Sequence, residues 1–128
     1  KIKAIKLLVS APFHSKYMLE TSNHLKKSFE KLIFKTPIIP IVLNYSARPY
    51  EDLGDLKNSL VKQTFSTVRW YESISFMIEE GTAMFLEIGN GNTLSNMIKR
   101  MEFKKALNAI SLSSIKQIEA FTGSNNAS

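Results

Sequence analysis

The chain contains two histidines, and one of them stands where a catalytic site could form. His14 follows the β-prone run 2–9 and the tripeptide Ser10-Ala11-Pro12, where proline stops a strand, and a helical pattern begins at Ser15. Sites in open α/β sheets form beyond the carboxyl ends of strands, and imidazole takes up and returns protons near neutral pH. His14 is therefore a candidate general base, although this position also suits a helix-capping or solvated histidine.

The remaining polar residues do not complete a catalytic set. His24 lies within a helical pattern beside charged residues, which favours a surface position. No serine has the Gly-x-Ser-x-Gly context of a nucleophile elbow, and Ser10 and Ser15 are near His14 only in sequence. No cluster of His, Asp and Glu has metal-ligand spacing, so we predict no metal site.

Two further features allow either a structural or a functional interpretation. The turn Gly89-Asn90-Gly91 could bring backbone amides to an anion, but it lacks the third glycine of a dinucleotide fingerprint and the lysine of a phosphate loop. A plain tight turn is the alternative. Gln63 lies beside Leu56 and Leu60 on a helical wheel, so its amide is predicted to face inward and to need a hydrogen-bond partner.

The elements that would position these residues alternate along the chain. An amphipathic helix is predicted from Ser15, because its buried stripe recurs at spacings of four and three: Met18, Ser22, Leu25, Phe29 and Leu32. Strands are predicted over 2–9, 41–43, 83–88 and 106–112, with 41–43 buried on both faces and a polar turn over 44–52. Further helices are predicted over 53–64, from about 70 to Gly81, over 94–101, and from Ser114, where Gln117 completes a capping box.

This alternation predicts an α/β fold with a mostly parallel sheet. Four strands make a small sheet for such a fold, which an incomplete domain would explain. The first residue is Lys1 and not Met, so we expect the sequence to begin inside a longer protein. The polar tail 123–128 is predicted to be disordered.

Composition narrows the classes of function. The 128 residues are 44% hydrophobic and 22% charged, which is typical of a globular domain, and no apolar run is long enough to span a bilayer. The absence of cysteine excludes disulfides and fits a reducing compartment. The net charge of +6 comes mostly from lysine, which favours anionic partners but also suits an ordinary solvated surface. Nucleic acid is disfavoured as a partner, because the lysines are scattered.

Several segments together resemble the malonyl-CoA:acyl carrier protein transacylases and the acyltransferase domains of fatty-acid and polyketide synthases. The family patterns that they match are a catalytic-histidine motif, Asn-Val-x-Ala-Lys/Arg-Pro, Leu-Val-x-Gln, Val-x-Trp-x-x-Ser and Glu-x-Gly-Pro-Gly. In the same order, the matching segments are 9–15 (VSAPFHS), 44–49 (NYSARP), 60–63 (LVKQ), 68–73 (VRWYES) and 87–91 (EIGNG). Asn90 and Asn92 depart from the proline and the lysine that are usual in the family. Five matches in the family's order make the resemblance specific.

The resemblance implies a ping-pong transfer of malonyl from coenzyme A, through a serine, to the phosphopantetheine thiol of acyl carrier protein. His14 matches the histidine that serves as base and then acid. Gln63 matches a glutamine whose backbone carbonyl is expected to orient that histidine. Phe13 and Asn44 match positions near the substrate, and Phe13 resembles the form associated with malonyl over methylmalonyl selection.

The resemblance also implies that much of the enzyme is absent from the sequence. The serine nucleophile, the oxyanion glutamine and the malonyl-binding arginine of the family precede its histidine, and none can be placed here. Residues 1–10 would be the last strand of an inserted ferredoxin-like subdomain. Residues 11–122 would be the C-terminal part of a three-layer, α/β-hydrolase-like large subdomain. We therefore expect the chain to need the N-terminal half of the same enzyme and to be inactive alone.

Other implications concern partners and location. No permanent cofactor is expected, malonyl-CoA is the expected substrate, and no membrane or nucleic-acid partner is expected. The expected location is the bacterial cytoplasm, or an organellar stroma or matrix. The alternative from another functional class is a non-catalytic module that uses its lysine surface to bind an acidic carrier protein or another anion.

Overall fold

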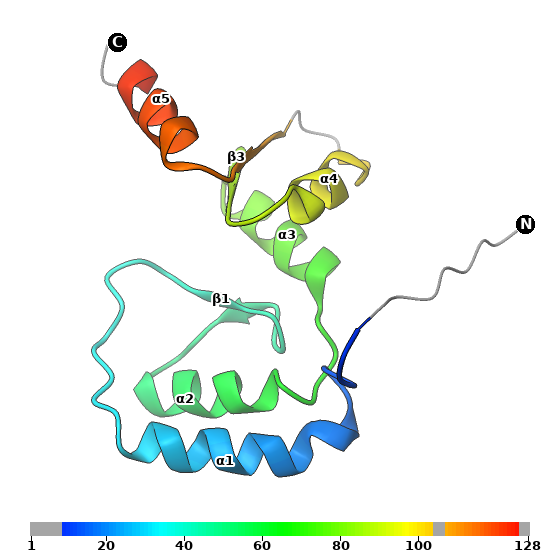
Figure 1. The fold of residues 1–128 in the computed structure, drawn as a ribbon, viewed down its shortest axis with the longest axis vertical. Coiled ribbons are helices and arrows are strands. Elements are labelled where there is room, and N and C mark those ends of the chain that lie inside the picture. Colours follow the sequence, from blue (N-terminus) through cyan, green and yellow to red (C-terminus); the bar gives the residue numbers. More distant parts are fainter. Residues whose placement is uncertain (1–8, 104–106, 126–128) are drawn as a thin grey trace, which may run out of the picture. The chain divides into compact units, whose positions relative to one another are not determined.

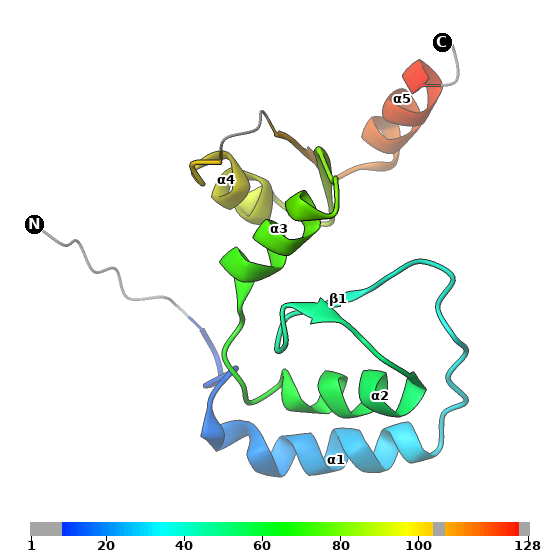
Figure 2. The ribbon, with the colours of Figure 1, turned by 180° about the vertical axis from the view of Figure 1, so that it is seen from behind.

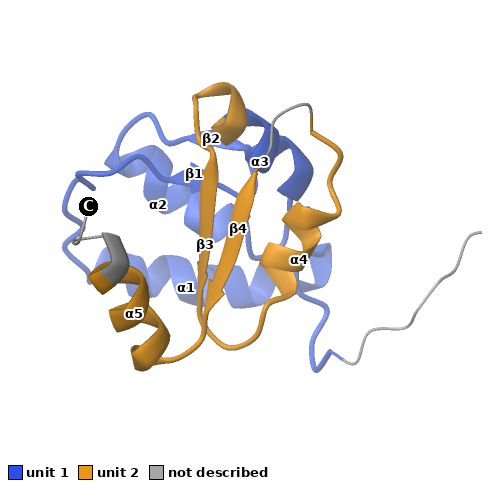
Figure 3. Ribbon diagram, turned by 90° about the horizontal axis from the view of Figure 1, so that it is seen from above, with its two compact units in different colours: residues 1–76 blue, residues 77–128 orange. Residues whose placement is uncertain are grey.

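The computed structural model describes residues 9–103 and 107–125 of the chain. It divides into two compact units, residues 1–76 and 77–128, which Figure 3 colours separately. The strand expected over 2–9 lies, apart from Val9, outside the described residues, and so does most of the expected ferredoxin-like segment 1–10. Each unit is described by itself.

Two helices lie side by side in the first unit (Figures 1 and 2). A 3-10 turn, η1 (Lys16–Met18), leads into α1 (Leu19–Glu30), and α2 (Leu53–Lys62) packs along α1. Met18 and Leu56 are buried, as the periodicity predicts. Leu32 is an exception: α1 ends at Glu30, so this last member of the predicted stripe lies beyond the helix and is half exposed.

The segment between these helices differs from the prediction. β1 (Val42–Leu43) pairs antiparallel with β2 (Arg48–Pro49), so part of the expected polar turn 44–52 is a strand. The segment 41–43 is not buried on both faces, because Ile41 is exposed and only Leu43 is fully buried. The strand β1 pairs with β2, the other strand of the same short hairpin. Hydrophobicity alone does not predict such an antiparallel pairing.

The helix α3 (Trp70–Glu79) contains the boundary between the two units. It buries Ile74 and Ile78. Gly81 ends it with a φ of 97°, and the amides of Gly81 and Thr82 return to the carbonyls of Ile78 and Met77. This left-handed C-terminal turn confirms Gly81 as the stop signal, since glycine adopts such a φ without a steric cost.

The second unit contains the parallel pair of the fold. β3 (Met84–Ile88) lies parallel to β4 (Asn108–Leu112), with Leu86 opposite Ile110. The connection between them includes α4 (Thr93–Lys99), and α5 (Ile115–Asn125) follows β4. The α/β class and a parallel sheet, formed by β3 and β4, are confirmed. The other described strands, β1 and β2, form a separate antiparallel pair.

The last helix extends further than predicted. Ser114 Oγ accepts the Gln117 amide, and Gln117 Oε1 accepts the Ser113 amide, which is close to the predicted capping box. Residues 123–125, assigned to a disordered tail by their composition, belong to α5, because the hydrogen-bonded helix continues through them. Residues 126–128 lie outside the described part of the chain.

An apolar row remains exposed on β3. Met84, Leu86 and Ile88 alternate along the strand onto one face and are 47%, 39% and 70% exposed. Parallel sheets in α/β domains are normally covered on both faces, so an exposed apolar face on β3 is unusual. Within the described residues, no helix is long and apolar enough to cross a membrane.

Candidate active site

His14 is held through both its backbone and its side chain by the end of α2. Its N–H donates to the carbonyl of Thr64 at 3.0 Å, and its ring Nδ1 lies 2.8 Å from the carbonyl oxygen of Gln63. A carbonyl oxygen only accepts, so Nδ1 must carry the proton in this contact. In the neutral ring, Nε2 is then the free lone pair. The geometry therefore selects the tautomer that a general base at Nε2 requires.

The two carbonyls are available because they lie where α2 ends. The last carbonyls of a helix have no intrahelical partner and are satisfied by other groups. Gln63 is the C-cap of α2, and its amide donates back to Ser59. Thr64 closes the turn through its amide and its hydroxyl, both of which donate to the carbonyl of Val61. The carbonyls of Gln63 and Thr64 are thus presented to His14 by a hydrogen-bonded turn.

The loop that carries His14 is locally strained. His14 has a φ of 60°, in the left-handed region that few non-glycine residues adopt. Ser15 Oγ donates to the carbonyl of Pro12 at 2.6 Å, and the Met18 amide donates to Ser15 to begin η1. Strained backbone of this kind persists only where the surroundings enforce it, and it clusters at functional sites. His14 does not cap the start of η1; its side chain instead contacts a carbonyl at the end of α2.

The contact of Gln63 is made by its backbone. The helical wheel predicts an inward amide, but α2 ends at Lys62, and the side chain of Gln63 at the C-cap is half-buried. This intermediate burial leaves the inward-facing amide of Gln63 a prediction, since the C-cap residue keeps helical backbone angles. The backbone contact expected from the family resemblance is present.

Phe13 and Asn44 are placed differently. Phe13 precedes His14 and its side chain is 58% exposed. Asn44 is exposed in the turn after β1, and its carbonyl accepts the Arg69 amide at 2.9 Å. No hydrogen bond among the described residues joins the side chain of Asn44 to His14. The structure thus joins His14 to Gln63 but does not join Asn44 to them.

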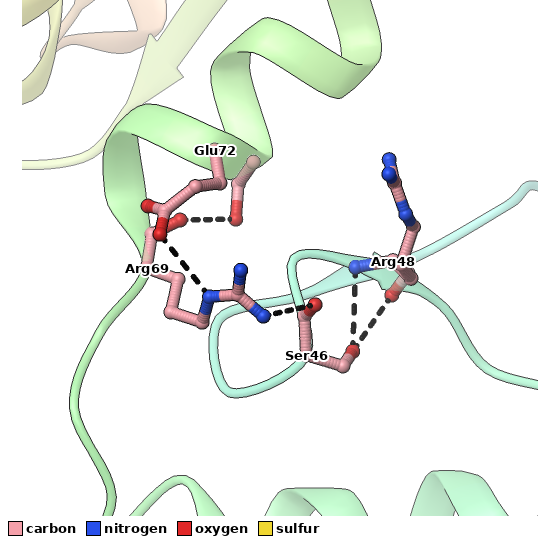
Figure 4. Close-up of polar contacts among 5 residues, drawn as sticks. Ser46, Arg48, Arg69 and Glu72 are labelled. Atoms are coloured by element: carbon pink, nitrogen blue, oxygen red, sulfur yellow. Dashed lines mark hydrogen bonds and ion pairs between the residues drawn. The ribbon is translucent and has the colours of Figure 1, made fainter.

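A cluster centred on Arg69 was not predicted from the sequence (Figure 4). Arg69 Nη1 donates to the carbonyl of Ser46 at 3.2 Å, and Nε pairs with Glu72 at 3.2 Å. The pKa of Glu72 is lowered, first by a hydrogen bond from its own backbone amide and then by the Arg69 side chain. The spacing of three between opposite charges was the only signal in the sequence.

In the second unit, Glu87 serves the start of α4. Its two carboxylate oxygens accept the amides of Leu94 at 3.1 Å and Ser95 at 2.8 Å. These hydrogen bonds, led by the one from Ser95, lower the pKa of Glu87. Gly91 has a φ of 95° in the preceding turn. The segment 87–91 thus acts as a helix-capping turn, and no group of three potential metal ligands occurs among the described residues.

The known proteins that this chain resembles in sequence and in structure include malonyl CoA-acyl carrier protein transacylases. No family model matches the chain. The malonyl CoA-acyl carrier protein transacylase of Bacillus subtilis (strain 168) is 37% identical over 117 residues, which are 91% of this chain and 36% of the relative. The crystal structure of the transacylase from Xanthomonas oryzae pv. oryzae matches with a TM-score of 0.83 and 30% identity, over 96% of this chain and 38% of that one.

A third match includes a carrier protein. It is a malonyl-transacylase in complex with its type II polyketide-synthase acyl carrier protein, with a TM-score of 0.80 and 30% identity over 91% of this chain and 38% of that chain. The chain therefore spans little more than a third of the length of these relatives. Over that span, both the sequence and the fold of the chain match these relatives. The chain belongs to the malonyl-CoA:acyl carrier protein transacylase family, of which it matches a partial, C-terminal stretch.

Proposed function

We propose that this chain is the histidine-bearing part of an enzyme that transfers malonyl from malonyl-CoA to the phosphopantetheine thiol of acyl carrier protein. The observation that carries the proposal is the contact between His14 Nδ1 and the Gln63 carbonyl. It leaves Nε2 free to accept a proton and keeps the ring in one orientation. The ring is exposed, so a nucleophile from outside the chain can reach it.

In the first half-reaction, His14 Nε2 takes the hydroxyl proton of a serine outside this chain as the serine oxygen attacks the malonyl thioester carbonyl. The carbon–sulfur bond then breaks, and the coenzyme A thiolate leaves with the proton from Nε2. In the second half-reaction, Nε2 takes the proton of the carrier-protein thiol, whose sulfur attacks the malonyl-serine ester. The serine oxygen leaves with that proton, which restores neutral His14.

The Gln63 carbonyl has a defined part in this cycle. When Nε2 is protonated, the ring carries a positive charge, and the carbonyl dipole at Nδ1 stabilises it without adding a buried carboxylate. The carbonyl also prevents the ring from turning Nδ1 toward the serine. Gln63 is thus a positioning residue, and His14 is the residue that touches the reacting atoms.

The wider assignments belong to the same proposal. The structural relative in complex with a carrier protein supports acyl carrier protein as the acceptor. The remaining part of the enzyme would complete an α/β-hydrolase-like subdomain and supply the serine, so the chain alone would be inactive. Phe13 would contribute to acyl selection and Asn44 would lie near the substrate. The proposed location is the bacterial cytoplasm, or an organellar stroma or matrix.

The test compares two histidine variants in the complete protein that contains this chain. His14→Ala is expected to lower kcat for malonyl transfer by about 10²–10⁴-fold, the usual contribution of a general acid–base group. His24→Ala is the matched control, because His24 is exposed on α1, and it should leave kcat unchanged. An active His14→Ala enzyme would remove His14 from the mechanism. A wild-type protein that binds carrier protein without turnover would favour the non-catalytic module.

A further inference from the structure

A pocket lies beside the turn that holds His14. It has a volume of about 450 Å³ and is lined by Tyr45 and Ser46 from one segment and by Ser66, Thr67 and Arg69 from another. All of its lining residues belong to the first unit. Ser66 follows Thr64, whose carbonyl holds the His14 backbone, by two residues. The pocket and the contacts of His14 therefore use residues of one short segment, 63–69.

The pocket contains a guanidinium that is fixed in place and only partly used. Arg69 has five N–H donors, of which one goes to the Ser46 carbonyl and one to Glu72 (Figure 4). Three donors are left for a ligand. Because the two hydrogen bonds already hold the side chain, little conformational entropy is lost when a ligand binds. A planar, preorganised guanidinium is suited to phosphate oxygens, which it can bind through two parallel hydrogen bonds.

The other lining groups complete a donor set. The hydroxyls of Ser66 and Thr67 have no hydrogen-bond partner among the described residues, and both line the pocket. Tyr45 supplies an aromatic wall, and the ammonium of Lys62 lies 5.2 Å from the centre of its ring. No acidic residue lines the pocket. The only carboxylate shown next to it, Glu72, is already paired with Arg69.

From this arrangement we propose that the pocket binds a phosphate group of the acyl-thioester substrate, with Arg69, Ser66 and Thr67 as its donors. The inference rests on the proposed function only for the identity of the phosphate, which occurs in coenzyme A and in the phosphopantetheine of a carrier protein. Binding there would hold the thioester near the turn at the end of α2 that contacts His14. Arg69 would then affect substrate affinity, and the chemical step would remain with His14.

Direct binding to the complete protein tests the site. Calorimetric titrations would use coenzyme A, 3′,5′-ADP, 4′-phosphopantetheine and phosphate-free pantetheine. Arg69→Gln is expected to weaken binding of a phosphate-bearing probe about tenfold, the usual effect of removing charged hydrogen bonds, and to leave pantetheine unaffected. If Arg69→Gln weakens the binding of 3′,5′-ADP, the pocket binds a phosphate at the nucleotide end of coenzyme A. If it weakens the binding of 4′-phosphopantetheine, the pocket binds the phosphate of the phosphopantetheine arm.

A second variant separates binding from the shape of the turn, because Arg69 also holds Ser46. Ser66→Ala combined with Thr67→Val removes the two free hydroxyls and leaves the Arg69 contacts intact. This double variant should weaken the binding of the same phosphate-bearing probe and raise the KM for malonyl-CoA without lowering kcat. Arg100→Gln removes a cation elsewhere in the chain and should change neither quantity.

The possible outcomes separate a failure of the phosphate site from a failure of the proposed transferase function. Unchanged affinity for every phosphate-bearing probe in both pocket variants would overturn the phosphate site, even if malonyl transfer by the wild type is intact. If the wild type transfers no malonyl but the pocket variants lose affinity for the probes, the phosphate site stands and the transferase proposal fails.

Discussion

At the scale of single residues, His14 shows how a backbone conformation can prepare a side chain. Its φ of 60° turns the chain so that its amide and its ring both reach the end of α2, on the adjacent carbonyls of Thr64 and Gln63. A left-handed φ at a non-glycine residue costs about 1–3 kcal/mol, which the two hydrogen bonds help to offset. The cost is confined to the one residue whose orientation matters for proton transfer.

The use of a backbone carbonyl leads to a prediction about Gln63. Gln63→Ala removes the amide but retains the carbonyl that accepts from His14 Nδ1. We expect kcat for malonyl transfer, and its dependence on pH, to remain as in the wild type. Steady-state kinetics across the pH range would measure both. A loss of activity comparable with that of His14→Ala would show that the side chain of Gln63 takes part.

At the scale of elements, the contacts of His14 and of Glu87 both depend on how helices begin and end. Asp52 caps α2 by accepting the Asp55 amide at 2.8 Å, and the other end of α2 presents its free carbonyls to His14. In the second unit, Glu87 reaches from β3 to the first turn of α4. Carboxylates at the starts of helices and an imidazole N–H at a helix end satisfy groups that the helices themselves leave unpaired.

The lowered pKa of Glu87 predicts a dependence of stability on pH. Because the folded state holds this pKa below its ordinary value of 4.5, ionised Glu87 stabilises the fold above that pH. This contribution is lost as pH falls through the lowered pKa and the carboxylate is protonated. Glu87→Gln should therefore be less stable than wild type near pH 7, and the difference should shrink in acid.

Urea unfolding at neutral and acidic pH would measure this difference. Glu80→Gln is the matched control, since Glu80 is exposed just after α3 and its carboxylate accepts no hydrogen bond among the described residues. A constant difference between wild type and Glu87→Gln at all pH values would contradict the proposed origin of the effect.

At the scale of the whole molecule, the apolar face of β3 leads to a prediction about the chain in isolation. Met84, Leu86 and Ile88 form a continuous exposed row on a parallel pair that has only two strands. Exposed apolar patches bind dyes and other apolar surfaces. The 128-residue chain should therefore bind the dye ANS or self-associate, and Met84→Lys with Ile88→Lys should reduce both.

Fluorescence titration and analytical ultracentrifugation would measure these properties. Glu79→Gln with Glu80→Gln is the control for added charge, because it raises the net charge by the same amount, both residues are exposed and neither lies on β3. Equal dye binding and equal self-association in the two double variants would show that the face of β3 is not responsible.

Features of the fold that are determined by neighbouring residues were predicted from the sequence, whereas features that depend on pairing between segments were not. The burial of Met18 and of Leu56 on two separate helices, the stop at Gly81 and the strand 84–88 follow from periods and backbone preferences within a few residues, so the sequence predicted them. The pairing of β1 with β2 was not predicted, because strand partners depend on hydrogen bonds between segments that no local pattern specifies.

The same division applies to the sites. The residue types and order around His14 were enough to indicate the family and to name His14 and Gln63. Their hydrogen bond joins residues 49 apart in the chain, so only the folded chain establishes the tautomer of His14 and the exposure of its ring. The Arg69 pocket likewise needs the turn after β1 to meet the segment after α2. A chain encodes local preferences residue by residue, whereas a site is made by side chains and carbonyls that meet only after folding.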